Sequence, residues 1–166
     1  MGNHVMILGE AIKFIFPAYC ANAAPVLFGG GTPIDMDRKF LDGKPIFGKN
    51  KTFKGFISGL LVGTFAGFLE SIIFPGYQMS LGFFISLGAL LGDLAGAFLK
   101  RRIGMAPGEM LPIIDQIDFI MGAIILAFPF FELTLELVAV IFVITIPLHV
   151  LTNFVAYRLG LKSKPW

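Results

Sequence analysis

The sequence predicts an all-α integral membrane protein with five transmembrane helices in a single domain, residues 1–166. The chain is 56% hydrophobic and 14% charged, with a mean hydropathy of +0.83. Soluble domains are usually about 45–50% apolar and about 25% charged. A helix needs about 20 mostly apolar residues to cross the hydrocarbon. Five segments meet this requirement: residues 5–28, 56–74, 81–99, 113–131 and 133–157.

The first segment, residues 5–28, is predicted to be a permanent span and not a cleavable signal peptide. No basic region precedes it, and Gly, Pro and a long polar loop follow it. Its ionisable residues Glu10 and Lys13 are spaced i and i+3, so they can pair on one helix face.

The second and third spans carry glycine at every fourth position, and a tight turn at Pro75-Gly76 joins them. The two series are Gly55, Gly59, Gly63 and Gly67, then Gly88, Gly92 and Gly96. Such series form a smooth groove that another helix can approach closely. We expect both spans to pack along these grooves, which are also compatible with a homodimer.

The fourth and fifth spans, residues 113–131 and 133–157, are joined by a short acidic link that we expect to be solvated. Glu132 and Glu136 flank this link.

The cations of the chain are unevenly distributed between its loops. Every Lys and Arg except Lys13 lies in residues 29–55, residues 100–112 or the tail that follows the fifth span. Five crossings place these three regions on one side of the membrane, and the positive-inside rule makes that side cytoplasmic. We therefore expect an external N-terminus, two substantial cytoplasmic loops and a cytoplasmic C-terminus.

Three aspartates near the predicted cytoplasmic ends of the third and fourth spans stand out, because ionisable residues in membrane spans are costly. They are Asp93, Asp115 and Asp118, and Lys100, Arg101 and Arg102 lie beside them in the sequence. One interpretation is a set of ion pairs that fixes helix packing. The other is chemical, because Mg²⁺ sites commonly combine one or two carboxylates with substrate phosphates, and cations hold the remaining phosphate oxygens.

The first loop supports the chemical interpretation. It contains GGGTPID (residues 29–35) and FGKNKTFKG (residues 47–55). The alternative is a basic loop that faces lipid headgroups. A G-x-x-x-x-G-K match at Gly43–Lys49 is not a P-loop, because Asn50 replaces the required Ser or Thr and no strand precedes it. The single Cys20 and two distant histidines exclude an internal disulfide and a His-rich metal site.

These motifs resemble the membrane CTP-transferases that make CDP-activated lipids. The resemblance lies in G-D-L-x-x-x-x-x-K-R-R (Gly92–Arg102), P-G (Pro107-Gly108) and P-x-x-D-Q-x-D-F (Pro112–Phe119). The CDP-diacylglycerol synthases have a longer spacing and an H-G-G element that this chain lacks.

The pattern is instead similar to the small archaeal branch, the CDP-archaeol synthases. That branch also resembles the chain at A-N-A-A-P (Ala21–Pro25), G-x-P-I-D (Gly31–Asp35) and the run Asp42–Gly55. One departure is Ala97, where this family often has Ser.

The resemblance implies a Mg²⁺-dependent cytidylyltransferase of the plasma membrane, with an active site that faces the cytoplasm. Its substrates would be CTP and 2,3-di-O-geranylgeranylglyceryl phosphate, its products CDP-archaeol and pyrophosphate, and nucleic acid would play no part. The implied metal ligands are Asp93, Asp115 and Asp118, which together with Lys100 would be catalytic. The implied nucleotide and phosphate contacts are Asn22, Asp35, Lys44, Lys49, Lys51, Thr52, Lys54, Lys100, Arg101 and Arg102.

Other functions remain open on the residues alone. A CTP-dependent polyprenol or lipid kinase, or a CDP-diacylglycerol synthase-like enzyme, could use similar charges. A small transporter is the main non-enzymatic alternative, although transporters usually carry polar groups near the bilayer centre and repeated halves. A purely structural membrane subunit would leave the charged constellation unexplained.

Overall fold

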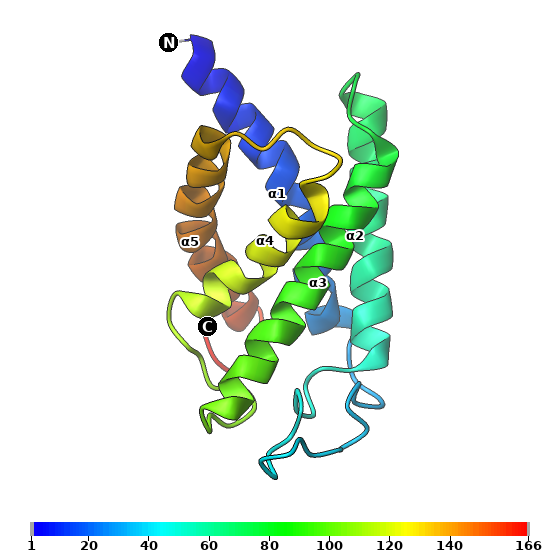
Figure 1. The fold of residues 1–166 in the computed structure, drawn as a ribbon, viewed down its shortest axis with the longest axis vertical. Helices are drawn as coiled ribbons and strands as arrows, with labels where there is room; N and C mark the ends of the chain where they lie inside the picture. Colours follow the sequence, from blue (N-terminus) through cyan, green and yellow to red (C-terminus); the bar gives the residue numbers. More distant parts are fainter. Residues whose placement is uncertain (1, 166) are drawn as a thin grey trace.

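The computed structural model describes residues 2–165 and consists of five helices joined by loops (Figure 1). The helices are α1 (Gly2–Phe28), α2 (Phe53–Ile73), α3 (Met79–Arg102), α4 (Ile114–Ala127) and α5 (Leu135–Arg158). Four of them, α1, α2, α3 and α5, are long and apolar enough to cross a membrane. The predicted all-α membrane architecture is therefore confirmed.

The fourth predicted span, residues 113–131, is not confirmed. In its place α4 has 14 residues, which at 1.5 Å per residue make it about 21 Å long, shorter than the roughly 30 Å of hydrocarbon. Pro112 and Ile113 precede the helix, and Ile113 has a φ of 70° that no helix contains. Pro129 follows closely and has no N–H to continue the helical hydrogen bonds. Residues 128–134 complete the path to α5 (Figure 1).

Glycines let the helices approach one another as the sequence predicts. A Cβ on Gly63 would lie 2.7 Å from the Cβ of Ala21 on α1, and a Cβ on Gly82 of α3 would lie 2.6 Å from the Cα of Gly67. A Cβ on Gly88 would lie 2.8 Å from the Cα of Ala123 on α4. Because helices of the same chain fill these grooves, the glycine pattern gives no separate support to a homodimer, with which the sequence was only compatible.

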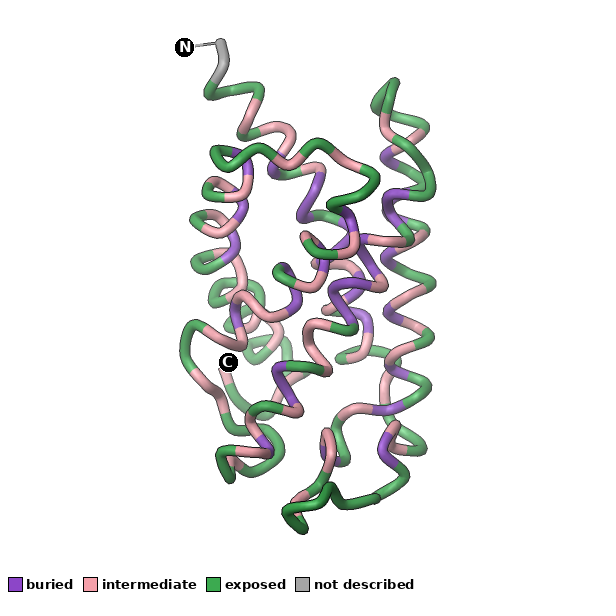
Figure 2. Tube along the Cα trace, in the orientation of Figure 1, coloured by how far each residue is buried: buried purple, intermediate pink, exposed green. Residues whose placement is uncertain are grey.

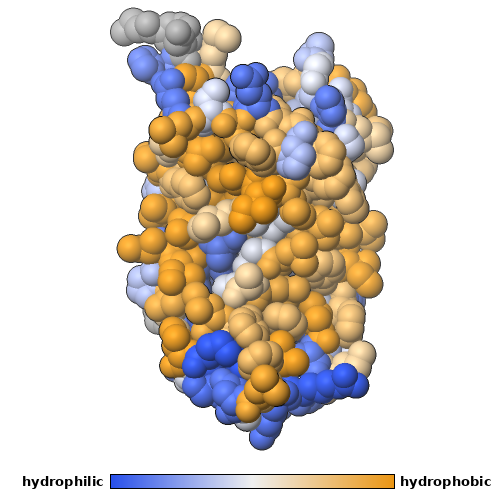
Figure 3. All heavy atoms as spheres, viewed as in Figure 1, coloured by the Kyte–Doolittle hydropathy of each residue, from blue (hydrophilic) through white to orange (hydrophobic). Residues whose placement is uncertain are grey.

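The interior and exterior of the bundle have the arrangement expected of a protein in lipid. Phe14, Ile85 and Phe119 are fully buried between the helices, and the buried segments face inward in Figure 2. Large apolar residues such as Phe65 and Val143 are exposed on the outside. On the face shown in Figure 3, hydrophobic residues cover most of the middle of the molecule, and hydrophilic residues gather at the end that holds the loops and also at the opposite end.

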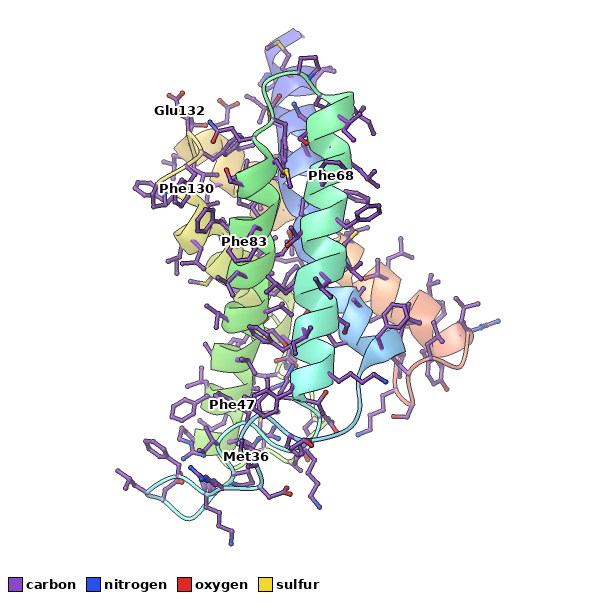
Figure 4. The ribbon with its side chains drawn as sticks, turned by 90° about the vertical axis from the view of Figure 1, so that its right-hand side faces the viewer. Met36, Phe47, Phe68, Phe83, Phe130 and Glu132 are labelled. Carbon is purple, nitrogen blue, oxygen red and sulfur yellow. The ribbon has the colours of Figure 1, made fainter. Side chains whose placement is uncertain are left out.

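That loop end combines segments far apart in the sequence. The first loop, residues 29–52, lies beyond the ends of α2 and α3, as Met36 and Phe47 show in Figure 4. Glu132 and Phe130 lie toward the opposite end, and Phe68 and Phe83 lie in the halves of α2 and α3 that are away from the first loop (Figure 4). The loop between α3 and α4 lies at the same end of the bundle as the first loop (Figure 1).

Candidate active site

A pocket of about 1330 Å³ opens toward the loop end of the bundle. Every helix contributes to its lining, together with the first loop, the α3–α4 loop and the segment after α5. Its polar lining comprises Asn22, Asn50, Lys51, Thr52, Asp93, Lys100, Glu109, Asp115, Gln116, Asp118, His149, Asn153, Lys162, Ser163 and Lys164. Its apolar lining includes Pro25, Val26, Phe56, Leu90, Pro147, Val150, Leu151 and Phe154.

The first of two ion pairs in the pocket joins the first loop to α3. Lys51 Nζ donates to Asp93 Oδ2 at 2.5 Å, and both side chains are about three-quarters buried. Lys51 is held in place because Thr52 caps α2, with its hydroxyl accepting from the Gly55 N–H at 3.1 Å. The Thr52 N-cap thus fixes the point at which the first loop ends and α2 begins. It thereby places Lys51 next to α3.

The second ion pair joins the end of α3 to the start of α4. Lys100 Nζ donates to Asp115 Oδ2 at 2.8 Å, and the same oxygen accepts from the Leu111 N–H at 3.1 Å. The other carboxylate oxygen of Asp115 is buried and has no hydrogen-bond partner. An orphaned buried carboxylate oxygen is costly, so this one is available to a ligand of the pocket.

Asp118 occupies space that a glycine leaves free. A Cβ on Gly96 would lie 2.8 Å from Asp118 Cγ, and Asp118 Oδ1 accepts from the Phe119 N–H at 2.6 Å. Gly92, one turn earlier on α3, similarly admits the backbone of Asp118. The glycines of α3 therefore bring the carboxylate of α4 beside Asp93.

The donor set of the pocket fits Mg²⁺ chemically, because carboxylate oxygens are the ligands that this ion prefers. Asp93, Asp115 and Asp118 all line the pocket, and Asp115 keeps one oxygen without a partner. In the described part of the chain, however, no three Asp, Glu, His or Cys side chains are grouped as around a metal ion. Asp93 and Asp115 are each paired with a lysine. The role of the three aspartates as metal ligands therefore stays a prediction.

The α5 side of the pocket was not predicted from the sequence. Asn153 Nδ2 lies 3.0 Å from the His149 carbonyl oxygen and 3.1 Å from His149 Nδ1. The His149 ring also packs against Phe119, with ring centroids 5.6 Å apart. The signal in the sequence was His149 and Asn153 at i and i+4 within an otherwise apolar span, a pattern that marks functional positions.

Six predicted phosphate contacts lie outside the pocket lining. Lys49 and Lys54 are exposed to solvent. The other four make contacts that organise the loops: Asp35, Lys44, Arg101 and Arg102. The placement of these six residues does not support the predicted contacts with nucleotide.

Asp35 holds the first loop together. Its carboxylate accepts from the backbone N–H groups of Phe47 at 2.9 Å, Gly48 at 2.8 Å and Asp37 at 3.2 Å. Burial raises the pKa of Asp35, but these N–H donors favour the charged form and leave its pKa below the ordinary value. The Asp35 carboxylate thus stabilises the conformation of the first loop through these three hydrogen bonds.

Arg102 joins the first loop to the end of α3. Its Nη1 donates to Asp42 at 2.6 Å, and its guanidinium lies 4.8 Å from the ring centroid of Phe40 and 4.7 Å from that of Phe98. Lys44 Nζ donates to the Arg102 carbonyl oxygen at 2.7 Å. Arg101 is buried and donates to the Ala106 carbonyl oxygen at 3.0 Å. These cations stabilise the frame of the pocket.

Comparison with known proteins decides the family. The profile described as "CarS-like: CDP-archaeol synthase" matches residues 4–166. The chain belongs to the CDP-archaeol synthase family. The membership confirms the resemblance seen in the motifs and favours an enzyme over a transporter or a structural subunit.

Relatives in this family match nearly the whole chain. The CDP-archaeol synthase of Pyrococcus abyssi is 44% identical over 163 residues, 95% of this chain and 97% of its own. That of Methanocaldococcus jannaschii is 36% identical over 173 residues, covering 96% and 98%. A solved structure of "an intramembrane enzyme for archaeal membrane lipids biosynthesis" is 35% identical with a TM-score of 0.84, covering 88% of this chain and 94% of that one.

Proposed function

We propose that the pocket transfers a cytidylyl group from CTP to an isoprenoid glyceryl ether phosphate, forming CDP-archaeol and pyrophosphate. The observation that supports this most strongly is the composition of the pocket. Four lysines and three aspartates line it beside apolar residues of α1 and α5. Such a pocket suits a reaction between a highly charged nucleotide and a lipid whose chains stay in the membrane.

The chemistry requires positioning more than proton transfer. An oxygen of the lipid phosphate attacks the α-phosphorus of CTP, a new P–O bond forms, and the bond from that phosphorus to the bridging oxygen breaks. Pyrophosphate leaves with the electron pair. Because the attacking oxygen is already anionic, no general base is needed, and alignment plus electrostatic stabilisation account for catalysis.

The pocket lysines are suited to hold the triphosphate. An ammonium has three donors, so Lys51 and Lys100 can each keep an aspartate and still donate to a phosphate oxygen. Asp93, Asp115 and Asp118 are the residues that would hold Mg²⁺. When bound, this ion neutralises phosphate charge and polarises the phosphoryl group.

We also propose that the pocket faces the cytoplasm of the cell. The loop end of the bundle carries the first loop and the α3–α4 loop (Figure 1), and these two loops hold most of the cations of the chain. The positive-inside rule assigns such loops to the cytoplasmic side, where CTP is available.

The test is an activity assay on the purified protein. Labelled CTP, Mg²⁺ and the geranylgeranyl ether phosphate should give a CDP-lipid and pyrophosphate in equal amounts. Asp118→Asn keeps the shape of the side chain and should lower turnover about 10²-fold or more, the scale for lost electrostatic stabilisation. Glu132→Gln, at the opposite end of the molecule (Figure 4), should leave turnover unchanged. No product from wild type with any lipid phosphate would overturn the proposal.

A further inference from the structure

The segment after α5 adds Lys162 and Lys164 to the pocket lining, and the sequence motifs include neither. Lys162 lines the pocket and its Nζ donates to Asn153 Oδ1 at 2.6 Å. Asn153 in turn contacts His149 through the carbonyl oxygen and ring of that residue. The three residues form a continuous network from the middle of α5 to the C-terminal segment.

A helix-ending motif turns the chain back to form this network. Gly160 has a φ of 72°, and its N–H donates to the Tyr157 carbonyl oxygen at 3.0 Å. The Leu161 N–H donates to the Ala156 carbonyl oxygen at 2.9 Å. These two bonds and the left-handed glycine make a Schellman motif. The chain therefore reverses after α5, and Lys162 lies beside Asn153.

Lys162 lies in the electrostatic field of the ion pairs already described. Burial lowers the pKa of Lys162, and Lys51 and Lys100 lower it further, whereas Asp115 and Asp93 raise it. Among the ion pairs of residues 2–165, none includes Lys162. Its partner Asn153 is neutral, so the ammonium keeps donors for an anion that enters the pocket.

The neighbours of Lys162 distinguish between the two anionic substrates. Besides His149 and Asn153, α5 lines the pocket with the apolar Pro147, Val150, Leu151 and Phe154, and the last three are about half exposed. These four apolar side chains suit hydrocarbon chains and have no hydrogen-bonding group for a ribose or a triphosphate. Lys51 and Lys100 are instead paired with the aspartates.

From this arrangement we infer that Lys162 binds the phosphate of the lipid substrate, whose chains lie along these apolar side chains of α5. The inference rests on the proposed cytidylyl transfer and assigns different lysines to its two substrates. Lys51 and Lys100 serve the nucleotide, and Lys162 holds the attacking phosphate. Asn153 is a positioning residue that directs the ammonium into the pocket.

Steady-state kinetics with each substrate varied separately test the inference. Lys162→Met should raise KM for the lipid phosphate about tenfold or more, as expected for loss of a charge-assisted hydrogen bond, and change KM for CTP less than about twofold. Lys162→Arg should restore most of the lipid affinity. Arg158→Met removes the same charge from the exposed end of α5 and should change neither constant.

Two outcomes of these kinetics would overturn the inference. They are an unchanged KM for the lipid phosphate, or an equal rise in both constants. If wild type itself forms no product, the proposed function fails and the inference is judged by labelling alone.

Chemical labelling of the wild-type protein avoids any folding defect in a variant. Acylation of surface amines, read by mass spectrometry, should show Lys162 protected by a geranylgeranyl ether phosphate and not by CTP. Protection by CTP alone, or by neither compound, would contradict the assignment. Thermal unfolding midpoints of the variants, measured in detergent, separate a binding defect from a folding defect.

Discussion

Gly96→Ala tests whether the glycines of α3 position the carboxylate of Asp118, for which we propose a catalytic role. The new Cβ would lie 2.8 Å from Asp118 Cγ and closer still to Oδ2. Because carbon atoms pack at about 3.5–4.0 Å, Cγ must retreat by roughly 0.7–1.2 Å. A displacement of about 1 Å in an active site can cost about 10²-fold in rate, which corresponds to about 2.7 kcal/mol of barrier. We therefore expect turnover to fall by about that factor.

The stability of this variant should change little, because the obstructing atoms belong to a side chain that can rotate. Gly92→Ala provides the contrast, since its Cβ would lie 3.0 Å from the Asp118 carbonyl carbon and 3.1 Å from the Gly122 nitrogen. Backbone atoms cannot rotate away, so α4 must move at a cost of about 1–3 kcal/mol. Gly9→Ala on α1 meets nothing within 4 Å and should change neither property.

The assay pairs turnover with the unfolding midpoint in detergent. Gly96→Ala should lower turnover and keep the midpoint, whereas Gly92→Ala should lower the midpoint. Wild-type turnover in Gly96→Ala would refute the reasoning, because Asp118 would then tolerate displacement. Equal loss of stability in both variants would refute the distinction between side-chain and backbone obstruction.

Two further predictions concern the loops. The lowered pKa of Asp35 means that its stabilising effect is complete above the ordinary value of about 3.9 and is lost as pH falls through the lower folded value. Asp35→Asn should therefore lower the unfolding midpoint at pH 7, and its disadvantage should shrink in acid; equal midpoints at pH 7 would contradict the role of Asp35. In a background without Cys20, single cysteines at Lys49 and Ser163 should be labelled from the same, cytoplasmic face by an impermeant reagent. Labelling from opposite faces would contradict the topology.

Much of the fold could be predicted because the relevant signals are local. Four long apolar helices follow directly from hydropathy, and the glycine series predicts the helix faces that pack. The complete span predicted over residues 113–131 is not confirmed, because an apolar run does not have to be one helix. Prolines near both ends limit α4 to Ile114–Ala127.

The candidate site could be predicted only in part, for a related reason. Asp115 and Asp118 are recognisable from i, i+3 spacing on one helix, and Asp93 from its position in an apolar run. Arg102 belongs to the same motif as Lys100 in the sequence, yet it contacts Asp42 and the rings of the loop frame. Neighbours in the sequence point to different sides of a helix, so motif membership did not predict which cation enters the pocket.

The sequence by itself determined that the chain is a helical membrane protein, that its cations gather in three segments, and that its motifs resemble the CDP-archaeol synthases. Those properties depend on residue type and short-range spacing alone. Only the tertiary structure decided that Lys51 meets Asp93, 42 positions away, and that Lys162 enters the pocket beside Asn153. Such contacts depend on how helices pack and on where a chain turns back, which no local pattern specifies.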